Sequence, residues 1–230
     1  MKNLPLVSVV IPLYNYAKYI AAGLDSVFAQ TYSPIEVIVI DDGSTDNSAN
    51  VVRAYSKVRY FYQKNQGVAV ARNMGITQTT GEFIAFLDAD DLWEPDKLKI
   101  QMQYMLENPE IIITATKVLS FLEPDTRIPT WFKSERELGE TNGIVLSAVV
   151  VRSRIFSQIG DFSPSFCPSE DTEWLCRVKD AQINLVTIPK PLTLRRLHGY
   201  NLTWQMISTA SSRTLRIFRE SLARKSLQGL

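Results

Sequence analysis

Hydrophobic residues in the first half of the chain form short continuous runs that alternate with helix-like segments. The runs begin near residues 7, 35, 58 and 82 and are rich in Val, Ile and aromatic residues. This composition is typical of strands buried on both faces. Apolar residues three and four positions apart indicate helices at 18–30, 47–55 and 67–76. Four strand–helix units of similar length predict a doubly wound α/β fold with a mostly parallel sheet.

The second half is less regular. A helical pattern follows Pro95 and runs to about Asn108. Prolines and glycines over 123–142 predict a long loop. Further strands are expected at 111–114, at 144–151 and in extended segments over 184–197, and a last helix over 202–227. We therefore predict one domain over 1–205, with a nucleotide-type half (1–115) and a less regular second half (116–205) that shares the same sheet. A C-terminal amphipathic basic helix (206–230) follows it.

Composition limits the classes of function. The chain has 230 residues and a net charge of +1, so no overall electrostatic field favours a nucleic acid partner. One histidine and two cysteines do not support a zinc site, which usually needs four nitrogen or sulfur ligands. The chain begins without a signal-peptide core and no stretch approaches the ~20 apolar residues of a membrane span. We therefore expect a cytoplasmic protein, soluble or peripheral at the inner face of the membrane.

Acidic residues close two of the predicted strands. The run that begins at Phe83 ends in Asp88, Asp90 and Asp91, and the run that begins at Ile35 ends in Asp41-Asp42. The carboxyl ends of parallel strands lie at one edge of an open α/β sheet, where ligands bind. Carboxylates spaced Asp-x-Asp can hold a hard divalent cation, and that cation can hold a diphosphate. Turn or helix-capping chemistry is the alternative, and it fits Asp91 taken alone.

The loop after the first strand excludes two common nucleotide sites. It reads Pro12-Leu13-Tyr14-Asn15, with no glycine, so the glycine-rich turn of a dinucleotide-binding fold is absent. No phosphate-binding P-loop motif occurs either. A nucleotide would then be bound by acids and an aromatic ring. A carboxylate can accept a base imino proton or bind ribose hydroxyl groups, and a tyrosine can stack on a base.

An ordered set of short segments extends this interpretation. The set comprises Val9-Val10-Ile11-Pro12 with Tyr14-Asn15, Glu36 to Asp46, Asn65-Gln66-Gly67, Ala71-Arg72-Asn73, Asp88-Ala89-Asp90-Asp91, Gly160-x-Phe162, Glu170-Asp171 and Arg196-x-His198. In this order the segments resemble those of the family 2 glycosyltransferases of the GT-A fold. The resemblance spans residues 7 to 205 and implies a nucleotide-sugar-binding half (1–115) and an acceptor and catalytic-base half (116–205). It implies an enzyme that transfers a sugar from a nucleotide-diphosphate sugar to an acceptor hydroxyl with inversion.

The resemblance also assigns roles to residues. It implies that Tyr14 and Asp42 contact the nucleobase, with Arg72 nearby, and that Asp88 faces the ribose. Asp90 would bind Mn²⁺ or Mg²⁺, with His198 close to the metal or the diphosphate, and Asp171 would be the catalytic base. Further expected substrate-binding residues are Pro12, Asn15, Asp41, Ala89, Glu170 and Trp174. Inversion needs such a base on the face of the sugar opposite the leaving diphosphate.

Simpler interpretations of the same residues remain open. Glu170 and Asp171 would also favour the N-terminus of a helix, where carboxylates meet the positive end of the dipole. Arg72 could be a solvated helix charge and His198 an ordinary loop residue. Trp174 fits the core side of a helix better than a platform for a sugar.

Alternatives at the level of function remain as well. A nucleotidyltransferase would also be α/β and metal-dependent, but it would usually carry a glycine-rich basic loop that this chain lacks. A non-catalytic nucleotide-binding α/β module would explain Asp41-Asp42 but not Asp171. Among partners, a UDP-sugar is favoured as donor. The expected acceptor is a saccharide or lipid-linked hydroxyl, as in the assembly of surface polysaccharide or glycolipid. A homodimer stays open.

The C-terminal helix has two interpretations. One predicted face of this helix carries Ile207, Ala210, Thr214, Ile217, Phe218 and Leu222. Four arginines fall on its other faces. The favoured interpretation is a helix packed on the catalytic domain with a solvated basic face. The alternative is an interfacial helix that contacts anionic lipid.

Overall fold

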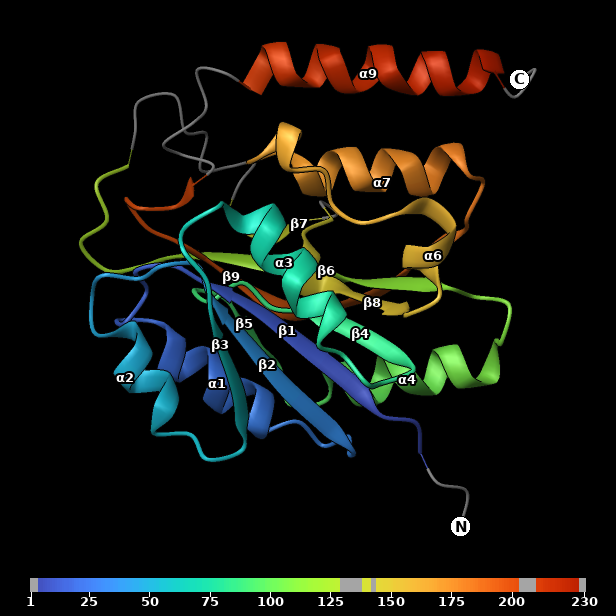
Figure 1. Cartoon of the computed structure of the whole chain (residues 1–230). Helices are drawn as coiled ribbons and strands as arrows, with labels where there is room; N and C mark the ends of the chain where they lie inside the picture. Colours follow the sequence, from blue (N-terminus) through green and yellow to red (C-terminus); the bar gives the residue numbers. More distant parts are fainter. Residues whose placement is uncertain (1–3, 129–137, 142–143, 203–209, 228–230) are drawn as a thin grey trace.

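The computed structural model describes residues 4–128, 138–141, 144–202 and 210–227. Within these ranges nine strands form one sheet in the order β3-β2-β1-β4-β8-β6-β9-β5, with β7 paired to β6. Helices cover both faces of the sheet (Figure 1). The doubly wound α/β architecture predicted from the sequence is therefore confirmed.

The N-terminal half follows the predicted order of strands and helices. Its elements are β1 (Val7–Leu13), α1 (Ile20–Phe28), β2 (Ile35–Asp41), α2 (Ser48–Arg53), β3 (Val58–Tyr62), α3 (Val68–Thr77) and β4 (Phe83–Phe86). The four strands pair in parallel, with β1 between β2 and β4. All seven residues of β1 are buried, because helices lie over both of its faces. Parallel pairing brings the ends of β1, β2 and β4 to one edge of the sheet.

The C-terminal half contains more varied elements. They are β5 (Leu92–Trp93), α4 (Lys97–Glu107), β6 (Ile113–Leu122), β7 (Gly139–Thr141), the 3₁₀ helix η1 (Leu146–Ala148), β8 (Val149–Arg152), α6 (Ile155–Ile159), the 3₁₀ helix η2 (Pro164–Phe166), α7 (Glu170–Asp180), β9 (Leu185–Leu197) and α9 (Ala210–Leu227). Strand β8 runs antiparallel to both of its neighbours, β4 and β6. It therefore joins the two halves of the sheet.

Several predicted boundaries in this half are wrong. The strand expected over 111–114 is the longer β6, because its second part pairs with β7 and β9. The strand expected over 144–151 is instead η1 followed by β8. The extended segments around two prolines form one strand, β9, whose pairing shifts register opposite Lys117. Part of the predicted 123–142 loop and residues 203–209 of the predicted last helix lie outside the described residues.

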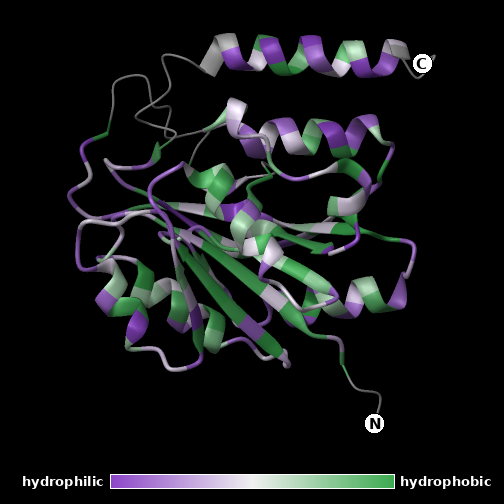
Figure 2. Ribbon diagram, in the orientation of Figure 1, coloured by the Kyte–Doolittle hydropathy of each residue, from purple (hydrophilic) through white to green (hydrophobic). Residues whose placement is uncertain are grey.

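The core lies on both sides of the sheet. Helices α1, α2 and α4 cover one face, where Ile20, Leu24 and Leu98 pack against β1 and β4. Helices α3, α6 and α7 cover the other face, where Phe156 and Trp174 belong to the second cluster of buried residues. Figure 2 shows the central strands as predominantly hydrophobic ribbons and the surrounding helices as mixed ones. The sheet therefore fixes the position of every helix that carries a candidate site residue.

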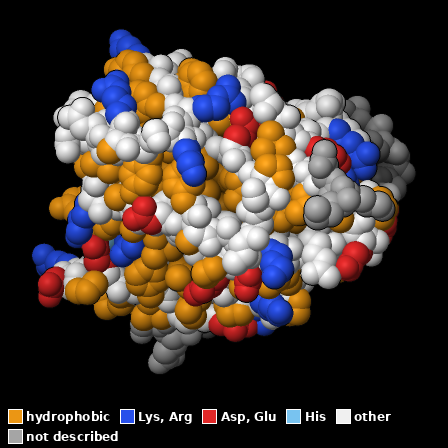
Figure 3. Space-filling view, turned by 90° about the horizontal axis from the view of Figure 1, so that it is seen from below, with side chains coloured by type: hydrophobic (Ala, Val, Ile, Leu, Met, Phe, Trp, Pro, Cys, Tyr) orange, Lys and Arg blue, Asp and Glu red, His pale blue; other side chains and the backbone are white. Residues whose placement is uncertain are grey.

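One glycine sets the distance between α3 and the sheet. A Cβ atom at Gly75 would lie 2.3 Å from Cγ1 of Val10 in β1, so only glycine permits this approach. The close packing holds α3, which carries Arg72, against the middle of the sheet. On the opposite side, around α1, α2 and α4, acidic and basic side chains are interspersed (Figure 3).

Candidate active site

A cavity of about 550 Å³ opens at the edge where β1, β2 and β4 end. Residues from both halves of the chain line it, including the start of α7. Most of the residues that the sequence singled out are in its wall: Pro12, Tyr14, Asn15, Asp42, Arg72, Asp88, Ala89, Asp90, Glu170 and Asp171. The two acidic strand ends and the distant Glu170-Asp171 pair therefore share one cavity.

Asp42 is fixed by the loop that follows β3. Its Oδ1 atom accepts hydrogen bonds from the Gln63 side chain at 2.7 Å and from the Gln66 backbone at 2.8 Å, and its Oδ2 atom accepts one from the Gly67 backbone at 2.8 Å. Gly67 has φ 90°, a backbone conformation that favours glycine, and it precedes α3. These bonds hold the carboxylate in one orientation at the cavity wall.

Tyr14 and Asn15 form the turn between β1 and α1. Asn15 has φ 55°, in the left-handed region that asparagine tolerates better than most residues. Its side-chain oxygen accepts a hydrogen bond from the Thr45 backbone at 2.7 Å, which ties this turn to the loop after β2. Tyr14 is 46% exposed and lines the cavity, so its ring is available to stack on a planar ligand.

Arg72 joins Asp88, which follows β4, to the start of α7. Its Nη2 atom donates to Asp88 at 2.7 Å, and its Nη1 atom donates to Glu170. The guanidinium is buried, and the adjacent carboxylates of Asp88 and Glu170 raise its pKa against the opposing effect of burial. Arg72 is therefore a charged bridge between a residue that follows β4 and the first residue of α7.

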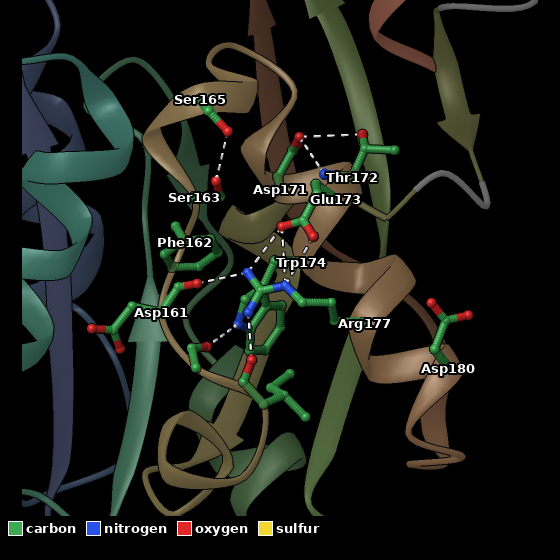
Figure 4. A network of polar contacts seen from close by, with 12 residues as sticks. Asp161, Phe162, Ser163, Ser165, Asp171, Thr172, Glu173, Trp174, Arg177 and Asp180 are labelled. Atoms are coloured by element: carbon green, nitrogen blue, oxygen red, sulfur yellow. Dashed lines mark hydrogen bonds and ion pairs between the residues drawn. The ribbon is translucent and has the colours of Figure 1, made fainter. Parts of the chain in front are cut away.

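Asp171 stands at the N-terminal turn of α7, beside Glu170. Burial raises the pKa of the Asp171 carboxyl above its usual range, although Arg72 lowers it in part. One oxygen, Oδ1, contacts the backbone nitrogen of Thr172 (Figure 4). A half-buried carboxylate of raised pKa is a suitable acceptor for a proton at neutral pH.

The turn before η2 is fastened to α7 by two side chains. Trp174 donates from its indole nitrogen to the carbonyl of Gly160 at 3.1 Å. Arg177 donates to the carbonyls of Ile159 and Asp161 and pairs with Glu173 (Figure 4). These bonds fix the position of α7 relative to the turn before η2. Asp171 lies in the first turn of α7 and is therefore held in place as well.

The surroundings of Asp90 fit a divalent cation that takes most of its ligands from elsewhere. Asp90 Oδ2 lies 3.0 Å from Nε2 of His198 and 3.1 Å from the side-chain nitrogen of Asn201. The Tyr200 backbone donates to Nδ1 of His198 at 3.1 Å, which places the proton of the neutral ring on Nε2, facing Asp90. No bond to Asp90 Oδ1 is formed by the described residues, so that oxygen is available.

A cation at this position would have few protein ligands. Among the described residues, no group of three or more His, Cys, Asp or Glu side chains is arranged to hold a metal ion. Mg²⁺ is commonly bound by one or two carboxylates together with substrate phosphates and water. One available carboxylate oxygen in a cavity wide enough for a nucleotide fits that mode of binding.

Three predicted site residues lie outside the cavity wall, and their contacts explain why. Asp41 is fully buried and accepts hydrogen bonds from Tyr60 and the Ser44 backbone, so it stabilises the loop after β2. Trp174 is 0% exposed and packs in the core beneath α7, so it offers no platform for a sugar. His198 lies behind Asp90 and stacks on Tyr19, with ring centroids 4.7 Å apart.

The cavity also contains residues that the sequence prediction missed. Arg195, Tyr200 and Asn201 line it, as does Cys167. Arg195 and Tyr200 lie next to the Arg196-x-His198 segment. Their position beside that segment could have indicated that they belong to the site. Asn201 gave no signal of its own, because its contact with Asp90 joins positions far apart in the chain.

Comparison with known proteins agrees with this geometry. The family described as "Glycosyl transferase family 2" matches residues 8–158, which is more than half of the chain. The chain belongs to glycosyl transferase family 2. The match includes Tyr14, Asp42, Arg72 of α3 and the Asp88–Asp91 cluster.

Curated relatives match part of this family 2 chain. An uncharacterised glycosyltransferase of Nostoc sp. is 49% identical over 98 residues, which is 40% of this chain and 30% of that protein. The putative teichuronic acid biosynthesis glycosyltransferase TuaG of Bacillus subtilis is 40% identical over 108 residues, covering 45% of this chain and 43% of TuaG. The chain thus spans less than half the length of these relatives.

Solved structures of similar fold cover nearly the whole chain. S. aureus TarS (residues 1–349) has a TM-score of 0.73 at 20% identity and covers 95% of this chain and 64% of that chain. The mannosyltransferase PcManGT of Pyrobaculum calidifontis, in complex with GDP-Man and Mn²⁺, has a TM-score of 0.71 at 19% identity, over 96% and 65%. At these identities the likeness shows the fold, which is the GT-A fold.

Within the described residues, no helix is both long enough and apolar enough to cross a membrane.

Proposed function

We propose that this family 2 chain transfers a sugar from a nucleotide-diphosphate sugar to an acceptor hydroxyl with inversion at the anomeric carbon. The observation that carries the proposal is that Asp171 and the Asp88–Asp90 cluster line the same cavity although about eighty residues separate them. An inverting transfer needs a base on one side of the sugar and a site for the leaving diphosphate on the other.

In this proposal Tyr14 stacks on the nucleobase, Asp42 accepts a hydrogen bond from it, and Asp88 binds the ribose. Asp171 takes the proton of the acceptor hydroxyl as its oxygen forms a bond to the anomeric carbon. The bond between that carbon and the diphosphate oxygen breaks, and the diphosphate leaves with the electron pair. The raised pKa of Asp171 favours this role, because a more basic carboxylate takes up a proton more readily.

Asp90 would hold the cation, Mn²⁺ or Mg²⁺, and His198 and Asn201 orient its carboxylate. The bound cation would stabilise negative charge on the leaving diphosphate. The Mn²⁺ in the PcManGT complex supports a divalent ion. Arg72 binds both Asp88 and Glu170. It would therefore hold the donor-binding Asp88 at a fixed distance from α7, which carries Asp171.

A UDP-sugar is the favoured donor. Structures of TarS hold UDP and UDP-GlcNAc, and the PcManGT structure holds GDP-Man. The description of TuaG as a teichuronic acid biosynthesis glycosyltransferase supports an acceptor in surface polysaccharide assembly, either a saccharide or a lipid-linked sugar. An acceptor of that kind would suit a protein at the inner face of a membrane. Membership of family 2 argues against a nucleotidyltransferase.

The test is transfer by Asp171→Asn, which keeps the side-chain shape and removes the basicity. A panel of UDP-, GDP- and dTDP-sugars with Mn²⁺ or Mg²⁺ identifies the donor through release of the nucleoside diphosphate. With that donor, turnover should fall about a hundredfold or more, while donor affinity stays within about twofold. The wild-type rate should rise with pH through the raised pKa of Asp171, because only the carboxylate is active, and this limb should be missing in the variant.

Asp161→Asn is the matched control, because Asp161 is exposed in the turn before η2 and outside the cavity wall. It should keep wild-type turnover. Normal turnover in Asp171→Asn would refute the base, and nucleotide binding with no transfer to any acceptor would favour a non-catalytic module.

A further inference from the structure

Helix α9 is attached to the domain mainly by polar contacts with α7. The buried Asp180 accepts hydrogen bonds from Ser221 at 2.7 Å and from Arg224 at 2.9 Å. Arg224 also lies 3.6 Å from the carboxylate of Glu173. Figure 1 shows α9 running beside α7 as the outermost helix on its side of the sheet. One side of α9 is therefore bound to the domain by ion pairs and hydrogen bonds.

The large apolar side chains of α9 mostly face outward. Leu215 and Phe218 are each 59% exposed and Leu222 is 67% exposed, whereas Ile217 is 2% exposed. Figure 2 shows hydrophobic bands on this outer helix among hydrophilic ones. A helix that packs on its own domain usually turns its apolar stripe toward the core. Among the described large apolar residues of α9, only Ile217 is buried against the domain. The other three, Leu215, Phe218 and Leu222, are exposed.

This arrangement corrects the apolar face predicted from the sequence. That face grouped Ile217 with Phe218 and Leu222, but the structure buries Ile217 and exposes the other two. Thr214 is exposed, and Ile207 and the side chain of Ala210 lie outside the described part of the chain. The outer stripe is defined by Leu215, Phe218 and Leu222, which are spaced three and four positions apart and so lie on adjacent turns.

Positive charge lies next to the outer stripe. Arg219 follows Leu215 by four positions and precedes Leu222 by three, so its side chain neighbours both. Arg219 is exposed and has no ion pair among the described residues. On the same helix Arg216 packs over the ring of Phe166, 4.3 Å from its centroid, and pairs with Glu220, the one acid between residues 203 and 230.

We propose that the outer stripe of α9 docks on an anionic lipid surface. Leu215, Phe218 and Leu222 enter the boundary between headgroups and acyl chains, and Arg219 meets the lipid phosphates. An exposed apolar stripe beside arginines is the pattern of an interfacial helix, and a basic residue near such a surface is attracted to anionic lipid. A second copy of the chain is a poorer occupant, because pairing two such stripes would bring like charges together.

The docking would also bring the cavity to the surface. Leu202 lines the cavity and α9 begins at Ala210, so the connecting chain spans at most about 30 Å. A hydroxyl acceptor carried by a lipid would then lie within reach of the candidate base. The lipid contact itself does not depend on the proposed transfer reaction, and a binding assay without substrates can test it alone.

The test is sedimentation of the full chain with vesicles of phosphatidylcholine, with and without phosphatidylglycerol. Wild type should bind the anionic vesicles, and added salt should weaken the binding. The triple variant Leu215→Ser, Phe218→Ser and Leu222→Ser should lower the bound fraction about tenfold or more. Arg219→Glu should lower it as well, and it alters an exposed residue that forms no ion pair with the described residues.

The matched control replaces two leucines and one phenylalanine that are exposed elsewhere: Leu4→Ser, Phe28→Ser and Leu106→Ser. Circular dichroism melting should give similar curves for all variants, and turnover on a soluble acceptor should be unchanged in the α9 variants. The proposal is overturned if wild type stays in the supernatant, or if Arg219→Glu and the triple variant bind like wild type. A wild-type dimer that the triple variant dissociates, with no lipid binding, would make the stripe an interface between copies.

Discussion

At the scale of single residues, Arg72 shows how far a side chain's role can differ from its appearance in the sequence. Its position in α3 allowed a solvated helix charge. The structure buries it between Asp88 and Glu170 instead, where each carboxylate offsets the cost of burying the guanidinium. Glu170 is itself buried, so removing Arg72 would leave an unpaired acid inside the protein.

We expect Arg72→Met to lower the free energy of unfolding by about 3 kcal/mol at neutral pH. Denaturation by urea measures this loss. Adding Glu170→Gln to Arg72→Met should restore part of the stability, because the acid that lost its partner is then neutral. Burial also raises the pKa of Glu170, so protonation should make the penalty smaller as the pH falls.

Arg59→Met is the control for this experiment. Arg59 pairs with Glu36 at 2.7 Å, but its side chain is 41% exposed, so its loss should cost about 1 kcal/mol or less. Equal losses in the two variants would contradict a special role for Arg72. The same variants separate positioning from folding in activity assays, since only Arg72→Met should lower turnover.

At the scale of elements, α7 connects the cavity to α9. Its first turn carries Asp171, its inner side packs Trp174 and Val178 in the core, and its outer side presents Glu173 and Asp180 to α9. Glu173 and Asp180 are buried yet paired with arginine, which is how charged side chains are accommodated away from water. Helices α7 and α9 therefore share one ionic contact surface.

Asp180→Asn should loosen α9 without disturbing α7. The amide cannot bind Arg224 through a charge-assisted hydrogen bond, and Ile217 alone holds little apolar area. Hydrogen exchange followed by mass spectrometry should show faster exchange in peptides from 210–227 and unchanged exchange in 174–180. Glu220→Gln, which breaks the exposed pair with Arg216, should change exchange in α9 much less. Protection of α9 equal to wild type in Asp180→Asn would show that these charges do not hold the helix.

At the scale of the whole molecule, the candidate site exists only because one sheet spans both halves of the chain. Antiparallel β8 lies between β4 and β6 and so ties the donor-side strands to β9, which leads to His198 and Asn201. Asp90 is thereby supported by residues more than a hundred positions away. Donor and cation should bind as a unit at this junction.

UDP affinity with and without Mn²⁺ tests this coupling. Isothermal titration of wild type should show tighter binding of UDP with Mn²⁺, by about tenfold, because the cation and the diphosphate attract each other and share a site. Asp90→Ala should abolish the gain, while Asp161→Ala, outside the cavity wall, should keep it. A gain that survives in Asp90→Ala would place the cation elsewhere.

The sequence by itself determined the class of fold and much of the cavity wall. Continuous apolar runs predicted the strands of the N-terminal half, of which β3 is only partly buried. Parallel topology predicted that Asp42 and Asp88–Asp90 lie at one edge of the sheet. Tertiary structure alone decided the antiparallel entry of β8, the burial of Asp41 and Trp174, and the support of Asp90 by Asn201. It also decided which side of α9 faces outward. Local patterns record which residues avoid water, whereas these features depend on partners distant in the chain, which no local pattern contains.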